Sequence, residues 1–361
     1  MELTHRGAAP HYRPHDVYVG NLITSLQCLD AGVTTVLDNS HNARTADHSN
    51  AAVEALFDAG IRAVHAFGAP RAGTWDQQWP RDIMRLRDEY FSSRDQLVTL
   101  RLFDAFPVSD VWEFAKTEGL WVSTEMGSHV GNLKDLHAAR LLTAEHTFNH
   151  CFGVSDDDWL LIQDAGVRVN VCPRLDASFR LGFGSESMRK ALSLGIRPGL
   201  SMDNEVSYGI DMFVEMQTLL LQQRARTFET TLAGEPDVPN HLGLGEVLEF
   251  ATVRGAQNCD LEDKVGSLIP GKEADIVLVR TTDISTFPLT NTLATLVTFA
   301  SRGNVDTVFV AGTVRKWRGR LVGHDLAKIQ KTVETSRDYL LSAQGLTSDP
   351  FAERGSKPIN T

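Results

Sequence analysis

Imidazole and carboxylate side chains recur in this sequence directly after short apolar runs that have the composition of strands. The residues in question are His41, His65, Asp104, Glu125, His150 and Asp203, with His129 four positions beyond Glu125. In a barrel of parallel strands the carboxyl ends meet at one mouth, so these side chains are expected to converge there. Convergent imidazoles and carboxylates can bind a divalent cation and leave a position open for water. The cation lowers the pKa of that water toward about 7, and a nearby carboxylate takes the proton as hydroxide attacks a C–N or similar carbon.

Each of these residues also has a structural interpretation. A buried histidine is more often a hydrogen-bonded core group than a ligand, and for His65 we favour that role or the lining of a substrate pocket. The two interpretations balance for His41. His146 and His150 have the spacing of a helical ligand pair, but the segment has strand composition, so only one can face the mouth. His129 can equally be a loop residue, and Asp203 a helix cap.

The elements that would position these groups alternate along the chain. Predicted strands cover 33–38, 61–67, 97–103, 120–125, 147–151, 167–172 and 197–203. Predicted helices cover 18–31, the region around 52–57, 111–118, 133–142, the region after Ser155 and 187–194. Ser155 and the three aspartates after it indicate a capped helix start. On this pattern His65 and Asp203 end their strands.

Seven strands that are apolar on both faces and separated by helices are typical of a parallel sheet covered by helices. An open doubly wound sheet also fits the count. No glycine-rich phosphate loop follows the first strand, however, and the polar groups gather at strand ends around the whole set. These features favour an α/β fold of the TIM-type (β/α) barrel class.

The type of predicted secondary structure changes after residue 262. Long helices are predicted before that point, over 211–226 and 245–259. After it, β-rich segments are predicted at 274–279, 305–310 and 313–321, with Pro270-Gly271 as the turn into them. We therefore predict a barrel over 1–262, a small C-terminal β-sandwich layer over 263–325, and over 326–361 a helix followed by a disordered polar tail from Thr347. The role of the layer is structural, so Lys272 and Asp275 are not expected to be catalytic.

Composition narrows the partners. The 361 residues carry a net charge of −11 without a basic patch, which argues against nucleic acid. No run is long and apolar enough to span a membrane. The four scattered cysteines indicate reduced thiols, and the N-terminus has no secretory h-region. We expect a cytoplasmic protein with a small-molecule substrate, and the sequence is compatible with a homo-oligomer.

One segment carries a family resemblance. Val265–Val279, VGSLIPGKEADIVLV, resembles the C-terminal signature of the metal-dependent amidohydrolase superfamily. Further similarity lies in EVLEFATVRGAQNCDL, DAGVTTVLD and NVDTVFVAGTV. The resemblance runs from about Tyr12 to Leu341 and is closest to the cytosine-deaminase and triazine-hydrolase branch. It implies metal-dependent hydrolysis of C–N bonds (amide, amidine or ring amino) in a small organic or heterocyclic substrate, with zinc, or alternatively iron, as cofactor.

The resemblance also implies roles for individual residues. His150 matches the metal-binding histidine of family strand six, and Asp203 the strand-eight aspartate that binds metal and moves the proton. Glu125 stands where strand five should end in histidine, with His129 as the shifted alternative. The implied catalytic groups are thus Asp203 and Glu125, and the implied metal ligands are His150, Asp203, Glu125 and His129. Apart from the resemblance, their positions at strand ends predict that His41, His65 and Asp104 contact substrate.

The start of the sequence departs from the family. The family's first strand ends in an HxH ligand pair, and no HxH occurs here. The seven strands would then be strands two to eight, which predicts a barrel without its first strand and with two unpaired edges. Two alternatives to a hydrolase follow: a pseudoenzyme or truncated product that keeps the barrel, and a metal-independent lyase or isomerase using Glu125, His150 and Asp203 as acid and base.

Overall fold

The computed structural model describes residues 7–71, 79–179, 181, 184–236, 238 and 240–346. These residues form a parallel sheet of seven strands and an antiparallel sheet of four. The strands of the parallel sheet are β1 (Thr35–Ser40), β2 (Arg62–Gly68), β3 (Val98–Phe103), β4 (Val122–Gly127), β5 (His146–Phe152), β6 (Arg168–Val171) and β7 (Gly199–Leu200). The second sheet contains β8 (Ile276–Val279), β9 (Val305–Val310), β10 (Thr313–Trp317) and β11 (Arg320–Leu321). Both predicted layers are therefore present, and the tail from Thr347 lies outside the described residues.

Helices separate most of the strands. They are α1 (Pro14–Asp30), α2 (Ala46–Ala59), α3 (Asp82–Tyr90), α4 (Ser109–Glu118), α5 (Leu133–Ala138), α6 (Asp156–Asp164), α7 (Pro173–Ser178), α8 (Gly184–Ser193), α9 (Met212–Leu232), α10 (Leu244–Phe250), α11 (Val253–Asn258), α12 (Thr292–Ala294) and α13 (Leu326–Ala343). Local signals explain several boundaries. Gly60 and Gly119 end α2 and α4 in the left-handed conformation that glycine adopts without strain. The Ser155 side chain accepts from the backbone of Asp158 and caps α6, as predicted.

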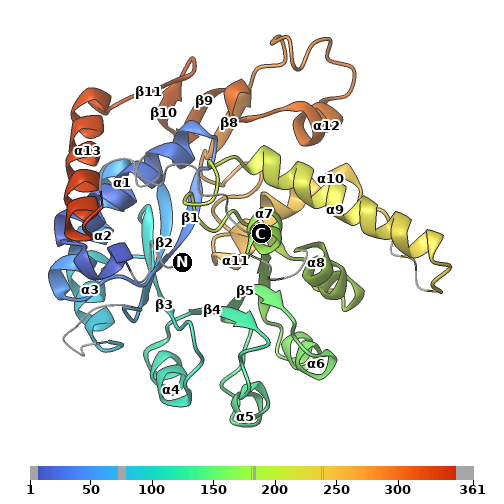
Figure 1. The fold of residues 1–361 in the computed structure, drawn as a ribbon, viewed down its shortest axis with the longest axis horizontal. Coiled ribbons are helices and arrows are strands. Elements are labelled where there is room, and N and C mark those ends of the chain that lie inside the picture. The colour runs from blue at the N-terminus through green and yellow to red at the C-terminus, as the bar shows by residue number, and fades with distance from the viewer. Residues whose placement is uncertain are drawn as a thin grey trace.

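The parallel strands follow one another in chain order, from β1 to β7. Figure 1 shows β1 to β5 as a curved row, with α3, α4, α5, α6 and α8 arranged around the outer side of the sheet. Among the described strands, β1 pairs only with β2 and β7 only with β6. The described strands thus form an open half-barrel of the (β/α) type, with the seven parallel strands that the sequence predicts.

Two groups of contacts attach other elements to this half-barrel: one joins α11 to β3 and β5, and the other joins the small sheet to β2. The carbonyl of Asn258, at the end of α11, accepts from buried Arg101 of β3 and from Thr147 of β5, each at 3.0 Å. The small sheet is tied to β2 because the Arg62 guanidinium donates two hydrogen bonds of 2.9 Å to Asp275 and one of 2.5 Å to Glu273. Asp275 also accepts from the backbone of Ala311 at 2.8 Å. These contacts support the structural role predicted for Asp275.

Several predicted elements were wrong in detail. No helix was predicted between the strands at 61–67 and 97–103, but this segment contains α3, whose buried side chains, Ile83 and Leu86, are too few to make a visible pattern. The helix predicted over 133–142 ends at Ala138, and α7 was not foreseen. The helix predicted over 245–259 is two helices, because Thr252 has a non-helical backbone. The strand predicted over 197–203 is only Gly199–Leu200, since Pro198 cannot donate to a neighbouring strand.

Candidate active site at the mouth of the half-barrel

Three of the predicted residues lie at the carboxyl end of the parallel sheet. Glu125 is near the end of β4, His150 is near the end of β5, and Asp203 follows β7. His150 and Asp203 have φ values of 67° and 62°, in the left-handed region that non-glycine residues rarely adopt. Such strain costs roughly 1–3 kcal/mol per residue and persists where the surroundings enforce it, often at functional sites. The predicted placement of His150 and Asp203 at one end of the sheet is confirmed.

An irregularity in the sheet sets the direction of His150. The register between β4 and β5 shifts after Met126, so that Gly127 is opposite Phe152. The next residue after His150, Cys151, is also left-handed, with φ 55°. The two consecutive left-handed residues and the shifted register bend the end of β5 where its imidazole is placed.

The His150 side chain is almost fully buried between two carboxylates. Its Nδ1 is 2.9 Å from Oδ1 of Asp176, a residue of α7 whose side chain is only 2% exposed. Its Nε2 is 4.0 Å from Oε2 of Glu125. Burial opposes the imidazolium form, but Cys172, the hydrogen bond to Asp176 and the charge of Glu125 together raise the pKa of His150 well above its usual value. The arrangement favours a protonated ring that donates to Asp176.

Glu125 is the more solvent-exposed partner of His150. Its side chain is 26% exposed, and its Oε2 is 3.8 Å from Nη2 of Arg71. Arg71 in turn lies over the Phe106 ring at 5.5 Å, and its backbone donates to the carbonyl of His41 at 3.1 Å. Glu125 is therefore between a guanidinium and an imidazole, and it retains access to solvent.

Asp203 is exposed as a residue, although its carboxyl group is largely desolvated by neighbouring protein atoms. That desolvation, together with the charges of Glu125 and Asp176, raises the pKa of Asp203, and His150 opposes the rise. Asn204 donates to Oδ2 of Asp203 at 3.2 Å. A carboxyl group with a raised pKa at the open end of a sheet is suited to exchanging protons.

The donor set does not fit a catalytic divalent cation. Such an ion is usually held by about three protein ligands plus water. Within the described ranges, no group of three or more His, Cys, Asp or Glu side chains is arranged to hold a metal ion. His129 is exposed in a loop, with its ring 5.6 Å from that of Phe106 and 5.8 Å from that of Phe152. The four ligands implied by the resemblance thus do not form a metal centre in this structure.

The three residues expected to contact substrate have other partners. His65 lies in the middle of β2, so the prediction that it ends the strand was wrong; its Nδ1 is 2.7 Å from Oδ2 of Asp38. Asp104 accepts from the backbone of Val108 and from Nε1 of Trp112, both at 3.0 Å, and burial raises its pKa to about 6. The ring of His41 is 5.9 Å from that of Phe103. Their contacts with substrate stay predictions.

Sequence reasoning missed Asp176 and Arg71. A signal for Asp176 was present, because Cys172-Pro173 places proline at the start of a helix directly after a strand, and Asp176 then falls in its first turn. Arg71 had none, since it follows β2 in a segment without periodicity.

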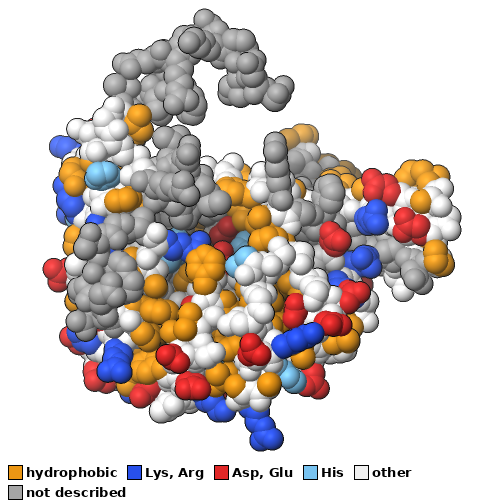
Figure 2. Space-filling model, turned by 60° about the horizontal axis from the view of Figure 1, so that its bottom comes forward, with side chains coloured by type: hydrophobic (Ala, Val, Ile, Leu, Met, Phe, Trp, Pro, Cys, Tyr) orange, Lys and Arg blue, Asp and Glu red, His pale blue; other side chains and the backbone are white. Residues whose placement is uncertain are grey.

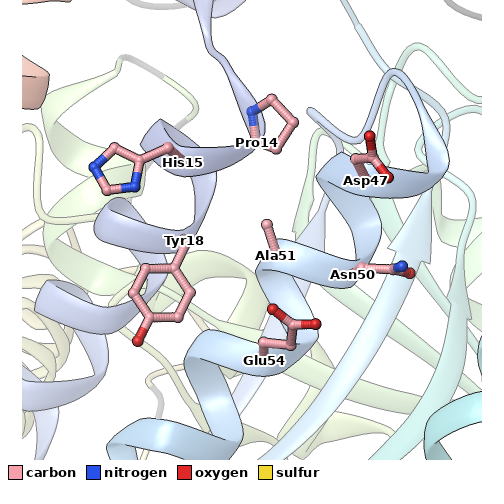
Figure 3. Close-up of a pocket in the computed structure, with 7 residues that line it drawn as sticks. All are labelled: Pro14, His15, Tyr18, Asp47, Asn50, Ala51 and Glu54. Atoms are coloured by element: carbon pink, nitrogen blue, oxygen red, sulfur yellow. The ribbon is translucent and has the colours of Figure 1, made fainter.

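Two cavities lie away from this mouth. One, of about 340 Å³, is between α1 and α2 and is lined by residues that include His15, Tyr18, Asp47 and Glu54 (Figure 3). The other, of about 430 Å³, has Arg168, Arg197 and Arg254 in its wall. None of the candidate site residues lines either cavity.

Comparison with known proteins identifies the family. The model of the Amidohydrolase family matches residues 114–315, more than half of the chain, so this chain belongs to the amidohydrolase family. A 5-methylthioadenosine/S-adenosylhomocysteine deaminase from Desulforudis audaxviator is 37% identical over 174 residues, which cover 48% of this chain and 38% of that protein. The protein of the same name from Moorella thermoacetica is 25% identical over 338 residues, 88% of this chain and 75% of its own length. The aligned part of this chain thus covers well under half of the length of the first relative and three quarters of the length of the second.

Solved structures share the fold. An adenosine deaminase from Xanthomonas campestris with bound zinc has a TM-score of 0.76 and 21% identity, over 95% of this chain and 80% of that one. Atrazine chlorohydrolase from Arthrobacter aurescens, complexed with zinc, has a TM-score of 0.73 and 20% identity, over 92% and 80%. These likenesses confirm the predicted barrel class.

The surface and the helices bear on partners. On the face shown in Figure 2, the acidic and basic side chains that are described lie interspersed among apolar ones. In the part of the chain that the structure describes, no helix has the length and apolar character needed to cross a membrane.

Proposed function

We propose that this chain hydrolyses a C–N bond, of amide, amidine or ring-amino type, in a small heterocyclic substrate. Two observations carry the proposal: the chain belongs to the amidohydrolase family, and Glu125, His150 and Asp203 are grouped at the carboxyl end of the sheet. The names of its relatives, deaminases of 5-methylthioadenosine and S-adenosylhomocysteine, favour a ring that carries an exocyclic amino group. In that reaction water adds its oxygen to the ring carbon, and ammonia leaves.

The chain's own residues supply proton transfer and positioning. Glu125 retains solvent access beside Arg71, so it can hold a carboxylate against an incoming water. Asp203, whose pKa is raised, can take the proton from that water and return it to the departing nitrogen. In its protonated form, which the raised pKa favours, the buried His150 ring would stabilise negative charge that develops on the substrate beside it. A general base of this kind contributes about 10²–10⁴ to the rate.

A divalent cation, zinc or alternatively iron, is the cofactor that the zinc-bound fold relatives suggest. When bound, such an ion would lower the pKa of a water molecule and so supply the nucleophile. His150 and Asp203 would be its ligands here, but they do not complete a donor set, and we assign no step to it. The described cysteines are all free thiols, which supports a cytoplasmic location. Exposed Leu221, Phe228 and Leu232 along α9 are compatible with the proposed homo-oligomer.

A second candidate is a pseudoenzyme that retains the barrel without turnover. The specific observations in its favour are the missing three-ligand group in the described residues and the open sheet between β1 and β7. In that case a heterocycle would bind at the mouth without being hydrolysed.

Ammonia release from aminopurines, aminopyrimidines and aminotriazines, measured with and without added Zn²⁺ or Fe²⁺, separates these candidates. The hydrolase proposal expects turnover that Asp203→Asn lowers by about 10²–10⁴ and that His150→Ala abolishes. Asp157→Ala, a substitution of an exposed residue on α6, is the control and should release ammonia at the wild-type rate with and without added metal. If wild type binds a heterocycle but releases no ammonia with either metal, the pseudoenzyme replaces the hydrolase.

A further inference from the structure

The short helix α7 has contacts with His150 and with Tyr208, which bonds the residue before Asp203. On one side Asp176 Oδ1 is 2.9 Å from Nδ1 of His150, and both side chains are at least nine-tenths buried. A carboxylate can only accept hydrogen bonds, so Nδ1 must carry the proton. The opposite nitrogen, Nε2, is then on the side of Glu125, at 4.0 Å. One contact with α7 therefore determines which edge of the ring faces the mouth.

On its other side α7 reaches the segment that carries Asp203. The guanidinium of Arg174 lies 4.0 Å over the ring of Tyr208, and the Tyr208 hydroxyl donates to the carbonyl of Met202 at 2.8 Å. Met202 is the residue before Asp203. Arg174 is itself held by the buried carboxylate of Glu215 on α9, with Nε 2.5 Å from Oε1. Of two residues in one helical turn, Asp176 thus contacts His150 directly, and Arg174 is linked through Tyr208 to the residue before Asp203.

The strained backbone at His150 explains why a contact such as the one with Asp176 is needed. Its φ of 67° is unfavourable for a residue with a side chain, and a strained residue keeps its conformation only where neighbours enforce it. A ring without the Asp176 bond would be free to turn about its χ2 torsion, for which two orientations are commonly accessible. The register of β4 against β5 also shifts directly after the pair Met126 and His150, so the strand ladder is irregular at this residue.

We propose that Asp176 is a positioning residue of this site: it holds the His150 ring through Nδ1, so that Nε2 faces Glu125 and the substrate. The assignment rests on the proposed function for its role in turnover. The placement of the ring, however, is a property of the folded chain alone. Helix α7 is, on this assignment, the part that sets His150 and Asp203 relative to each other.

The test compares Asp176→Ala, Asp176→Asn and the surface control Asp157→Ala in the full chain. The first readout is the Nδ1 proton of His150 in ¹H–¹⁵N NMR spectra, assigned by its disappearance in His150→Gln. We expect a protected downfield proton in wild type and in the control, its loss in Asp176→Ala, and its return at a new shift in Asp176→Asn, whose amide oxygen still accepts. The second readout is turnover, which should fall about 10–100-fold in kcat in Asp176→Ala, with KM little changed and partial recovery in Asp176→Asn.

The outcomes separate this assignment from the proposed function. A proton that persists in Asp176→Ala overturns the assignment, as does an Asp176→Asn variant with an unchanged resonance should the alanine variant not fold. Loss of the proton in Asp176→Ala supports it. If wild type shows no turnover while its ring proton still depends on Asp176, the proposed function fails and the positioning of His150 by Asp176 stands.

Discussion

The two edges of the parallel sheet end in different ways. At one edge β7 has only two residues, both buried, and Asn258 of α11 bonds the neighbouring strand through the carbonyl of Val169 at 2.7 Å. At the other edge β1 has six residues, and every one is only partly buried, whereas all seven of its neighbour β2 are buried. A short, covered edge offers little to a foreign strand, while a long one presents unpaired backbone groups. Among the described strands of the parallel sheet, β7 is thus short and lies against α11, whereas β1 is long and pairs on one side only.

The largest effect on stability is expected where β2, the neighbour of β1, is attached to the small sheet. Arg62 at the start of β2 is 1% exposed, and Asp275 is its buried partner. Asp275→Asn leaves that guanidinium without its main counter-charge, and removal of one partner of a buried pair costs about 3–5 kcal/mol. Urea unfolding should show this loss. Any remaining activity per folded molecule should match wild type, and a folded but inactive variant would contradict the structural role of Asp275.

The middle of the sheet provides a reference through Asp104, whose pKa is raised from 3.8 to about 6 by burial. Folding favours the protonated form of Asp104. Below about pH 4 this carboxyl group is protonated in both the folded and the unfolded chain, so it does not change the free energy of unfolding. As the pH rises from about 4 to 6, the unfolded chain loses this proton first, and the free energy of unfolding falls by up to roughly 3 kcal/mol. Asp104→Asn keeps an acceptor for Val108 and Trp112 and should remove that slope, being more stable than wild type at pH 8 and similar at pH 4. If the free energies of unfolding of wild type and Asp104→Asn changed with pH in the same way, the assigned effect of Asp104 would be refuted.

The covered edge can be opened by one side chain. A Cβ on Gly199 would be 2.5 Å from Oδ1 of Asn170 and 2.7 Å from Nδ2 of Asn258. Gly199→Ala should therefore push α11 away from β7, at a cost of about 1–3 kcal/mol typical of overpacking. Thermal unfolding measures this loss, and Gly131→Ala, where the added Cβ meets nothing within 4 Å, is the matched control. Equal melting temperatures for the two variants would show that α11 adapts.

The smallest effect on stability is expected at the open edge. Thr35 begins β1 and is partly exposed, so Thr35→Lys should change the free energy of unfolding by only about 0.5 kcal/mol. A lysine on an edge strand discourages edge-to-edge pairing. Light scattering at rising protein concentration should show less association than in wild type. Unchanged association would mean that the β1 edge is not where molecules meet.

Much of this architecture was predictable from the sequence because its strands are continuous apolar runs. The order of the strands, the small second sheet and the open edge all followed from that pattern and from the resemblance. The short β7 did not, since the effect of Pro198 on pairing outweighs the apolar run around it. For the candidate site, the sequence placed His150 and Asp203 at one end. It could not reveal that His65 pairs with Asp38 or that Asp176 holds His150, because both contacts depend on side-chain direction in the folded sheet.

The Arg62 clamp has a consequence for biosynthesis. Its partner Asp275 is 213 positions further along the chain, so β2 leaves the ribosome long before its counter-charge is made. Until then β2 would have to enclose a guanidinium without a carboxylate, which is costly. We expect the nascent half-barrel to stay loose until the segment around residue 275 has emerged, and the order of synthesis then delays burial of the first strands to a late stage of translation.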